Sequence, residues 1–218
     1  MREIVVDVQH VSKSFGSEQV LEDVTLQLMR GKIHGIIGRN GSGKTVLMKC
    51  ICGFLIPDSG SITVNGERVG VDVDFPRDMG LIIETPGFLP NMTGVKNLEI
   101  LASLNKKIGL EEIAAAIRRV GLDPLMKKPV GKYSLGMRQR LGIAQAIMED
   151  PALLILDEPL NGLDKHGVRE MRQLIKGLKE QGKTILLASH NQGDIDELCD
   201  TVCEMDAGVM TMIREESI

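Results

Sequence analysis

Apolar and polar residues alternate along the N-terminal part of the chain, as they do in half-exposed β-strands. Residues 4–11 are predicted to form a strand, followed by a loop at 12–18, and residues 20–29 alternate from Val24 onward. Residues 61–64 are also strand-like and end in Asn65-Gly66, a dipeptide typical of hairpin turns. This part of the chain therefore predicts an antiparallel β layer.

Other short segments are apolar almost throughout, which is typical of strands buried in a parallel sheet. They are residues 32–37, 79–83, 152–156 and 184–188. Segments with helical spacing or density lie between them, at 46–52, within 93–121, at 134–148 and at 165–181. Strands that alternate with helices predict an α/β fold with a parallel sheet.

Residues 87–150 have the composition of a helical block. Leucines recur every three residues after Thr93, a candidate N-cap, and Gly121 is expected to end a second helix. Ser134 is expected to begin a third helix, and Asp164 is a candidate N-cap for the later helix at 165–181. We therefore expect one domain over 1–218, in which 1–86 and 151–218 form the α/β core with its antiparallel layer and 87–150 form an inserted helical subdomain.

Composition narrows the classes of function. The chain has 218 residues, 43% of them hydrophobic, and a net charge of −4, which argues against bulk binding to nucleic acid or anionic membranes. No apolar run approaches the roughly 20 residues needed to span a bilayer, and the N-terminus lacks the shape of a signal peptide. We expect a cytoplasmic protein whose membrane role, if it has one, depends on a partner.

The cysteines are Cys50, Cys52, Cys199 and Cys203, and each lies among apolar neighbours. Their spacings do not make two matching pairs of the zinc-ribbon kind. They are interpreted as buried free thiols rather than as metal ligands or redox groups.

A glycine-rich segment follows the apolar strand at 32–37 and matches the phosphate-binding pattern G-x-x-x-x-G-K-[ST]. In this pattern, backbone N–H groups and a helix N-terminus surround the phosphates, the lysine reaches the β- and γ-phosphates, and the hydroxyl ligates Mg²⁺. The segment predicts a binding site for a nucleoside triphosphate. Its candidate binding residues are Gly38, Asn40, Gly41, Ser42, Gly43, Lys44 and Thr45.

Two adjacent acids, Asp157 and Glu158, end the buried strand at 152–156. Acids at such a position need a cationic partner, and Mg²⁺ on a nucleotide supplies one. Asp157 is placed to hold the metal, and Glu158 to polarise the water that attacks the γ-phosphate. The alternative is that the two acids are merely solvated at a strand end, and the phosphate-binding loop in the same chain makes this interpretation less favoured.

The segment 132–140 contains the sequence Tyr133-Ser134-Leu135-Gly136-Met137. It resembles the L-S-G-G-Q signature of the ATP-binding cassette (ABC) ATPases, with Ser134 and Gly136 retained. Ser134 is expected at a helix N-terminus, which favours anions. The resemblance implies that Ser134 and Gly136 contact ATP bound to a second cassette, because two cassettes of this family pair head-to-tail around two ATP molecules.

The other motifs of this family follow in order over essentially the whole chain. Residues 161–164 resemble the D-loop, which places Asp164 at the seam between two cassettes. His190, after a buried strand, resembles the switch histidine that contacts the γ-phosphate. Phe15 corresponds to the aromatic residue that stacks on adenine. Taken alone, His190 would be interpreted as structural and Phe15 as a core residue.

Glu84 stands where the family usually has a glutamine. An ionised glutamate accepts hydrogen bonds but does not donate them. We therefore expect Glu84 to bind Mg²⁺ or the attacking water, and to make turnover more dependent on the metal than a glutamine would.

The segment 84–93, together with the variant signature and D-loop, is similar to the bacterial bacitracin-resistance and lantibiotic-immunity exporters. The resemblance implies an ATPase subunit of an ABC transporter that uses ATP and Mg²⁺ and works with separate transmembrane permease subunits and a second ATP-binding subunit. Residues 85–93 and the helical block are expected to transmit motion to the permease through Phe88, Leu89 and Met92. The alternatives are a soluble ABC protein that acts on ribosomes or DNA, and a sensor that barely hydrolyses ATP. A P-loop kinase fits poorly, because nothing resembles a lid or an acceptor site.

Overall fold

The computed structural model describes residues 3–215 and contains two β-sheets. The smaller sheet is antiparallel and has the order β2-β1-β4-β5. Its strands are β1 (Ile4–Phe15), β2 (Glu18–Met29), β4 (Ser59–Val64) and β5 (Glu67–Arg68). Asn65 and Gly66 both have positive φ angles in the turn from β4 to β5, as the hairpin signal predicts.

The larger sheet has the order β10-β9-β3-β8-β7-β6, with every pair parallel except β9 with β10. Its strands are β3 (Ile33–Ile37), β6 (Met79–Ile82), β7 (Leu153–Asp157), β8 (Thr184–Ser189), β9 (Thr201–Asp206) and β10 (Val209–Arg214). The carboxyl ends of β3, β7 and β8 therefore meet at one edge of the sheet, where ligands bind in open α/β folds.

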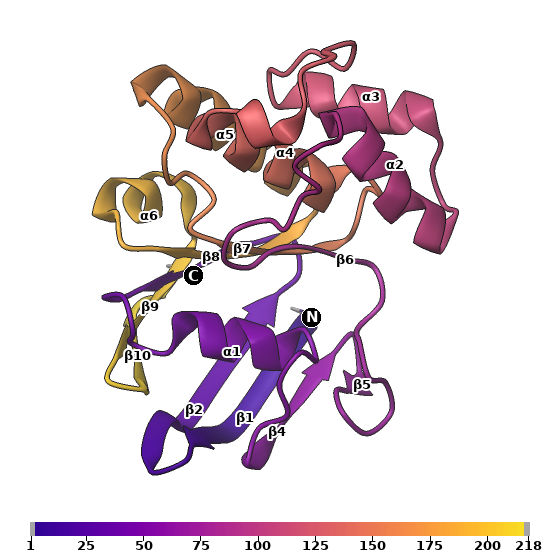
Figure 1. The fold of residues 1–218 in the computed structure, drawn as a ribbon. Helices are drawn as coiled ribbons and strands as arrows, with labels where there is room; N and C mark the ends of the chain where they lie inside the picture. The colour runs from indigo at the N-terminus through magenta and orange to yellow at the C-terminus, as the bar shows by residue number, and fades with distance from the viewer. Residues whose placement is uncertain (1–2, 216–218) are drawn as a thin grey trace.

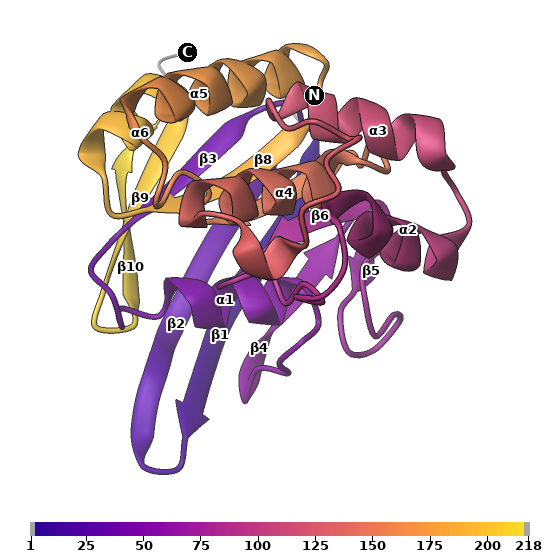
Figure 2. The same ribbon diagram turned by 45° about the horizontal axis from the view of Figure 1, so that its top comes forward.

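Helices cover both faces of this larger sheet (Figures 1 and 2). Helix α1 (Lys44–Ile51) lies between the two sheets. The opposite face carries α2 (Gly94–Asn105), α3 (Leu110–Arg119), α4 (Leu135–Ile147), α5 (Lys165–Glu180) and α6 (Gln192–Leu198), with a short 3₁₀ turn, η1 (Val130–Lys132), before α4. The predicted α/β fold with an antiparallel β layer is confirmed.

Side chains of the central strands alternate between two hydrophobic clusters. Leu153 and Ile155 of β7 pack with α1 and the antiparallel sheet. Leu154 and Leu156 of the same strand pack with the helices on the other face. All four are essentially inaccessible to solvent, which explains why this strand is apolar at every position.

The three predicted helix caps are confirmed. Thr93, Ser134 and Asp164 each precede a helix, and their side chains accept hydrogen bonds from the backbone N–H groups of Lys96, Met137 and Gly167. A cap of this kind contributes about 1 kcal/mol to stability. The caps therefore fix the starting points of α2, α4 and α5.

Two expectations were wrong or incomplete. The segment 12–15 was expected to be loop, but β1 continues to Phe15 because its backbone pairs with β2 as far as Glu18. The segment gives no alternating signal in the sequence, because its polar residues Ser12, Lys13 and Ser14 are partly buried and the apolar Phe15 is exposed. Helix α6 and strands β9 and β10 were not predicted.

None of the helices among residues 3–215 combines the length and the apolar character needed to cross a membrane.

Candidate phosphate-binding and catalytic site

A cavity of about 620 Å³ opens where β3 and β7 end, and residues from distant parts of the chain line it. The glycine loop and the start of α1 contribute residues 40–41 and 43–46. Glu84, Asp157 and Glu158 contribute three carboxyl groups. The remaining lining residues are Val20, Thr85, Leu135, Gln139, Asn161 and Gly162. The structure thus unites the predicted phosphate loop, the acid pair and Glu84 around one space.

Glycine is required at two points of the phosphate loop. Gly43 has φ +109°, and a Cβ there would lie 2.8 Å from the carbonyl oxygen of Val20. A Cβ on Gly38 would lie 2.3 Å from the carbonyl oxygen of Met205. Any larger residue would therefore have to displace backbone, so glycine at these positions lets β2 and β9 pack closely against the loop.

The loop holds its lysine without an acidic partner among the described residues. Lys44 is buried, and its Nζ donates to the carbonyl oxygens of Gly38 at 2.7 Å and Arg39 at 2.9 Å. The hydroxyl of Ser42 is buried with no hydrogen-bond partner among residues 3–215. A buried ammonium group without a counter-charge and an unpaired hydroxyl fit a loop that receives phosphate oxygens.

Thr45 and Asp157 meet at the start of α1. The Thr45 hydroxyl donates to Asp157 Oδ2 at 2.6 Å, although the two residues are 112 positions apart. No three His, Cys, Asp or Glu side chains within residues 3–215 form a ready metal-binding cluster. A hydroxyl beside a single carboxylate is a donor set that Mg²⁺ accepts, because this ion is bound by one or two carboxylates together with substrate phosphates.

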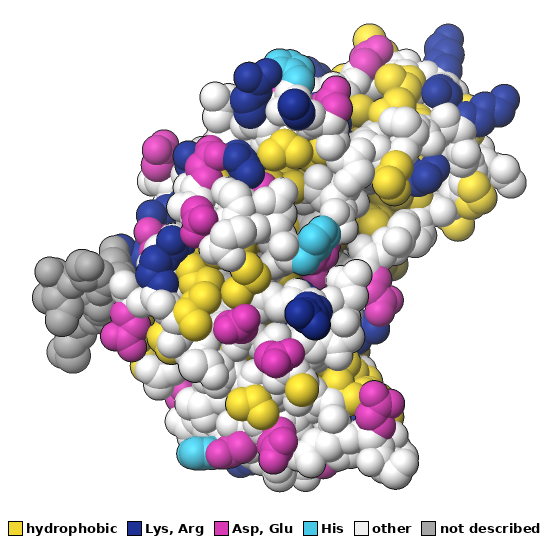
Figure 3. All heavy atoms as spheres, turned by 90° about the vertical axis from the view of Figure 1, so that its left-hand side faces the viewer, with side chains coloured by type: hydrophobic (Ala, Val, Ile, Leu, Met, Phe, Trp, Pro, Cys, Tyr) yellow, Lys and Arg dark blue, Asp and Glu magenta, His cyan; other side chains and the backbone are white. Residues whose placement is uncertain are grey.

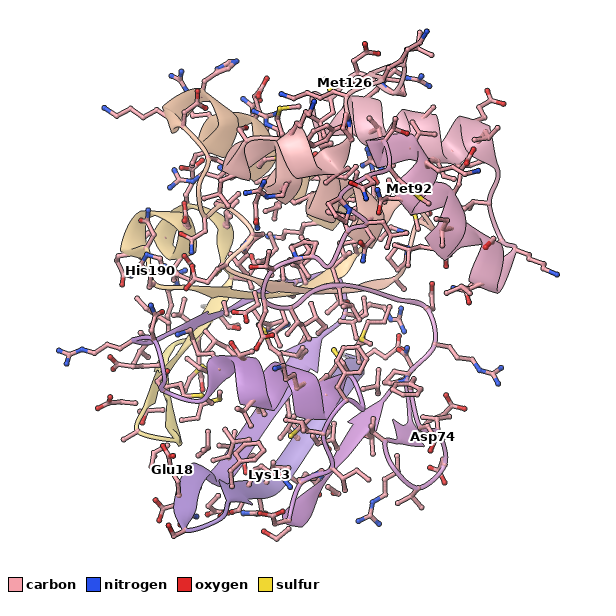
Figure 4. All side chains as sticks on the ribbon, viewed as in Figure 1. Lys13, Glu18, Asp74, Met92, Met126 and His190 are labelled. Atoms are coloured by element: carbon pink, nitrogen blue, oxygen red, sulfur yellow. The ribbon has the colours of Figure 1, made fainter. Side chains whose placement is uncertain are left out.

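Glu158 and His190 form a second contact beside the cavity. Glu158 Oε1 accepts from the backbone N–H of His190 at 3.0 Å and lies 2.9 Å from His190 Nδ1. The backbone of Glu158 is also hydrogen-bonded. Its N–H donates to the carbonyl oxygen of Ala188, and its carbonyl oxygen accepts from Gln139 Nε2. Figure 4 shows His190 near the start of α6, and the residue lines a neighbouring cavity with Gly38 and Arg39.

Glu84 makes an ion pair with a residue of α1. Its Oε1 lies 2.7 Å from Nζ of Lys49, one turn of helix beyond Thr45. The backbone of Glu84 has a positive φ of 59°, which is uncommon for a residue with a side chain. Because the Glu84 side chain is 62% exposed, the pair contributes little to stability and can exchange partners.

Seven predicted site residues are outside the lining of this cavity. Gly38 and Ser42 belong to the phosphate loop beside it, and His190 lines the neighbouring cavity. The other four are Phe15, Ser134, Gly136 and Asp164. Phe15 is 47% exposed at the end of β1, with Nζ of Lys13 5.7 Å from the centre of its ring. Ser134 and Asp164 act as helix caps within the chain. Gly136 lies against the D-loop, since a Cβ added to it would be 3.2 Å from the carbonyl oxygen of Gly162.

Val20, Leu135 and Gln139 line the cavity but were not predicted as site residues. Val20 carries no chemical group that would distinguish it from other strand residues. Gln139 could have been predicted from the sequence, because it lies one turn after Leu135 and Gly136 on the helix that begins at the signature segment.

The four cysteines are buried and free, which confirms their interpretation as buried thiols. Burial raises the pKa of Cys52 to about 12 and that of Cys50 to about 11. Burial likewise raises the pKa of Cys199 to about 12 and that of Cys203 to about 11. These thiols are protonated at neutral pH and are therefore poor nucleophiles.

Comparison with known proteins places this site in a family. The family model described as "ABC transporter" matches residues 21–161, which include the phosphate loop, the signature segment and the acid pair. A solved structure described as the ATP-binding subunit of an ABC transporter has a TM-score of 0.84 and 28% sequence identity. The superposition covers 96% of this chain and 90% of that one.

Three curated relatives match nearly the whole chain. The uncharacterised ABC transporter ATP-binding protein YybJ of Bacillus subtilis is 41% identical, with 94% of each chain covered. The bacitracin transport ATP-binding protein BcrA of Enterococcus faecalis is 40% identical over 94% of this chain and 68% of its own. The lantibiotic transport ATP-binding protein SrtF of Streptococcus pyogenes is 36% identical over 97% and 91%. The chain belongs to the ATP-binding proteins of the ABC transporter family, whose cassettes bind and hydrolyse ATP.

Proposed function

We propose that this chain powers export through separate membrane subunits by binding and hydrolysing ATP in the cavity between α1 and β7. The observation that carries the proposal is the hydrogen bond from Thr45 to Asp157, with Glu158 as the next residue. It brings a phosphate loop, a metal-binding pair and a candidate base to one place. This is the combination that phosphoryl transfer to water requires.

The phosphate loop is proposed to bind the triphosphate. Backbone N–H groups between Gly41 and Thr45 would surround the β-phosphate, and Lys44 would exchange its carbonyl partners for phosphate oxygens. Mg²⁺ would be held by Thr45, Asp157 and Glu84. When bound, it neutralises charge on the β- and γ-phosphates. Phe15, outside the cavity in this structure, is proposed to stack on the adenine.

Glu158 is proposed as the general base and His190 as its partner. An ionised Glu158 accepts the proton of the attacking water, and its contact with His190 fixes the direction of the carboxylate. His190 Nδ1 must carry a proton to donate to that carboxylate. The imidazole therefore orients Glu158, and it is proposed to contact the γ-phosphate of bound ATP.

Ser134, Gly136 and Asp164 are proposed to act on the nucleotide of a second cassette, for which we infer a second copy of this chain. None of the three lines the chain's own cavity, although Leu135, which lies between Ser134 and Gly136, does line it and is 54% exposed. The N-terminus of α4, which Ser134 caps, provides an end that favours anions.

The permease is proposed to dock on a groove between the sheet and the helices. A cavity of about 530 Å³ is lined by β6 with its preceding loop and by α2 and the end of α4. Phe75 and Leu104 in its wall are exposed, as are Leu89 and Met92 of the segment before α2. Phe88 instead packs against the core.

On the face shown in Figure 3, acidic and basic side chains are interspersed without a continuous basic stripe.

The transported compound is proposed to be an antimicrobial peptide of the bacitracin or lantibiotic kind, as the names of BcrA and SrtF state for those proteins. Deletion of the chain from its host should lower the concentration of bacitracin or of a lantibiotic that inhibits growth. The wild-type chain should restore resistance and Glu158→Gln should not. Unchanged inhibition by both compounds would reject this substrate class and favour an ATPase without export.

Glu84→Gln should make ATP hydrolysis less dependent on Mg²⁺. In the wild-type protein the carboxylate is paired with Lys49 and repels phosphate oxygens unless a metal lies between them. A neutral amide lacks that repulsion, so the variant should retain a larger share of its maximal rate at low Mg²⁺. Titration of Mg²⁺ at fixed ATP measures this, with Glu99→Gln on α2 as a control. Superimposable curves for wild type and Glu84→Gln would reject the role of Glu84.

A further inference from the structure

A buried ion pair lies directly behind the loop that carries His190. Arg172 of α5 donates from Nε and Nη2 to Oδ1 of Asp194 in α6, at 2.9 and 2.5 Å. The Asp194 side chain is only 6% exposed and that of Arg172 17%. Asp194 and Lys44 are among the few charged residues in the described chain that are buried.

The same carboxylate reaches the His190 loop with its other oxygen. Asp194 Oδ2 lies 3.4 Å from the hydroxyl of Ser189, and that hydroxyl accepts from the backbone N–H of Asn191 at 3.1 Å. These contacts hold the residues on both sides of His190. From the opposite side, Glu158 holds the backbone N–H and the imidazole of His190.

We propose that Arg172 and Asp194 are positioning residues for ATP hydrolysis, because they fix the loop 189–191 so that His190 meets Glu158. The inference rests on the proposed roles of His190 and Glu158. Arg172 donates both of its hydrogen bonds to Oδ1, which anchors the carboxylate and leaves Oδ2 to contact the loop.

A purely structural role for the pair, as a link between α5 and α6, does not explain its contact with Ser189. Helices α5 and α6 are already connected by Glu197, which contacts both Lys176 and Arg172. A buried ion pair is often no more stabilising than apolar residues of similar volume. An ion pair that only linked the two helices would not require the contact between Asp194 and Ser189.

The test compares Arg172→Met with Lys176→Met. Both remove a cation from α5 that contacts Glu197, but only Arg172 contacts Asp194. Arg172→Met should lower kcat roughly 10- to 100-fold, with KM for ATP and the affinity for a fluorescent ATP analogue nearly unchanged. Lys176→Met should leave kcat close to wild type. Equal effects of the two substitutions would overturn the inference.

A double-mutant cycle with His190→Ala separates positioning from general damage. If Arg172 acts through His190, Arg172→Met should cause no further loss of kcat in the His190→Ala background. Losses that multiply would overturn the inference while leaving the role of His190 intact. A normal kcat for His190→Ala would reject the proposed role of His190, and the inference with it. If thermal unfolding shows that Arg172→Met is not folded, Asp194→Asn replaces it in the same cycle.

Discussion

Glu158→Gln should abolish ATP turnover while leaving ATP binding intact. The glutamine amide has the same shape as the carboxylate, and its oxygen can still accept from His190. It cannot take a proton from water at neutral pH, and loss of a general base lowers rates by about 10²- to 10⁴-fold. Release of inorganic phosphate measures turnover, and equilibrium binding of a fluorescent ATP analogue measures affinity.

Glu67→Gln is a suitable control for that experiment. Glu67 is an exposed residue of β5, in the antiparallel sheet and outside the lining of the cavity. The control should hydrolyse ATP at the wild-type rate. If Glu158→Gln also retains most of its activity, the base has been assigned to the wrong residue.

Lys44→Ala should weaken ATP binding by roughly a hundredfold. The ammonium group of Lys44 is buried, and within residues 3–215 it donates only to two carbonyl oxygens of the loop, so its charge is available to phosphate. Hydrogen bonds to charged groups contribute about 1.5–3 kcal/mol each, so loss of one or two of them accounts for such a change. Titration of the protein with the fluorescent analogue gives the dissociation constant directly.

The matched control for Lys44→Ala is Lys96→Ala, which removes an exposed lysine of α2 paired with Glu99. Its dissociation constant should equal that of the wild type. An unchanged dissociation constant for Lys44→Ala would show that the nucleotide is bound elsewhere. Loss of binding together with a large drop in the unfolding temperature would instead indicate that the unpaired carbonyl groups of Gly38 and Arg39 have disturbed the loop.

Features encoded by neighbouring residues were predictable from the sequence. The phosphate loop needs glycines and Lys44 at fixed spacing, and the caps at Thr93 and Asp164 need only the residues three positions on. Strand β7 is buried on both faces, so its apolar run identifies it without reference to any partner. Local patterns were sufficient in each of these cases.

Features that depend on distant residues were not predictable. Lys49 and Glu84 are 35 positions apart, and only the packing of α1 against the larger sheet brings them together. The hydrogen bond between Arg172 and Asp194 needs the placement of α6, a short helix with no strong periodicity in the sequence. Strands β9 and β10 were missed because they share no pattern: β9 exposes the polar residues Glu204 and Asp206, whereas most of the exposed residues of β10 are apolar. The subdomain boundaries at 86–87 and 150–151 remain predictions.

The central claim is that two copies of this chain close around ATP, with Ser134 and Gly136 of one copy facing the phosphate loop of the other. Sedimentation velocity of Glu158→Gln protein with and without ATP tests it most directly, because bound ATP persists in a variant that does not hydrolyse it. The account predicts a monomer without nucleotide, a dimer with ATP, and a monomer again when Lys44→Ala is added. A protein that binds one ATP per chain and remains monomeric at every concentration would contradict pairing of identical chains.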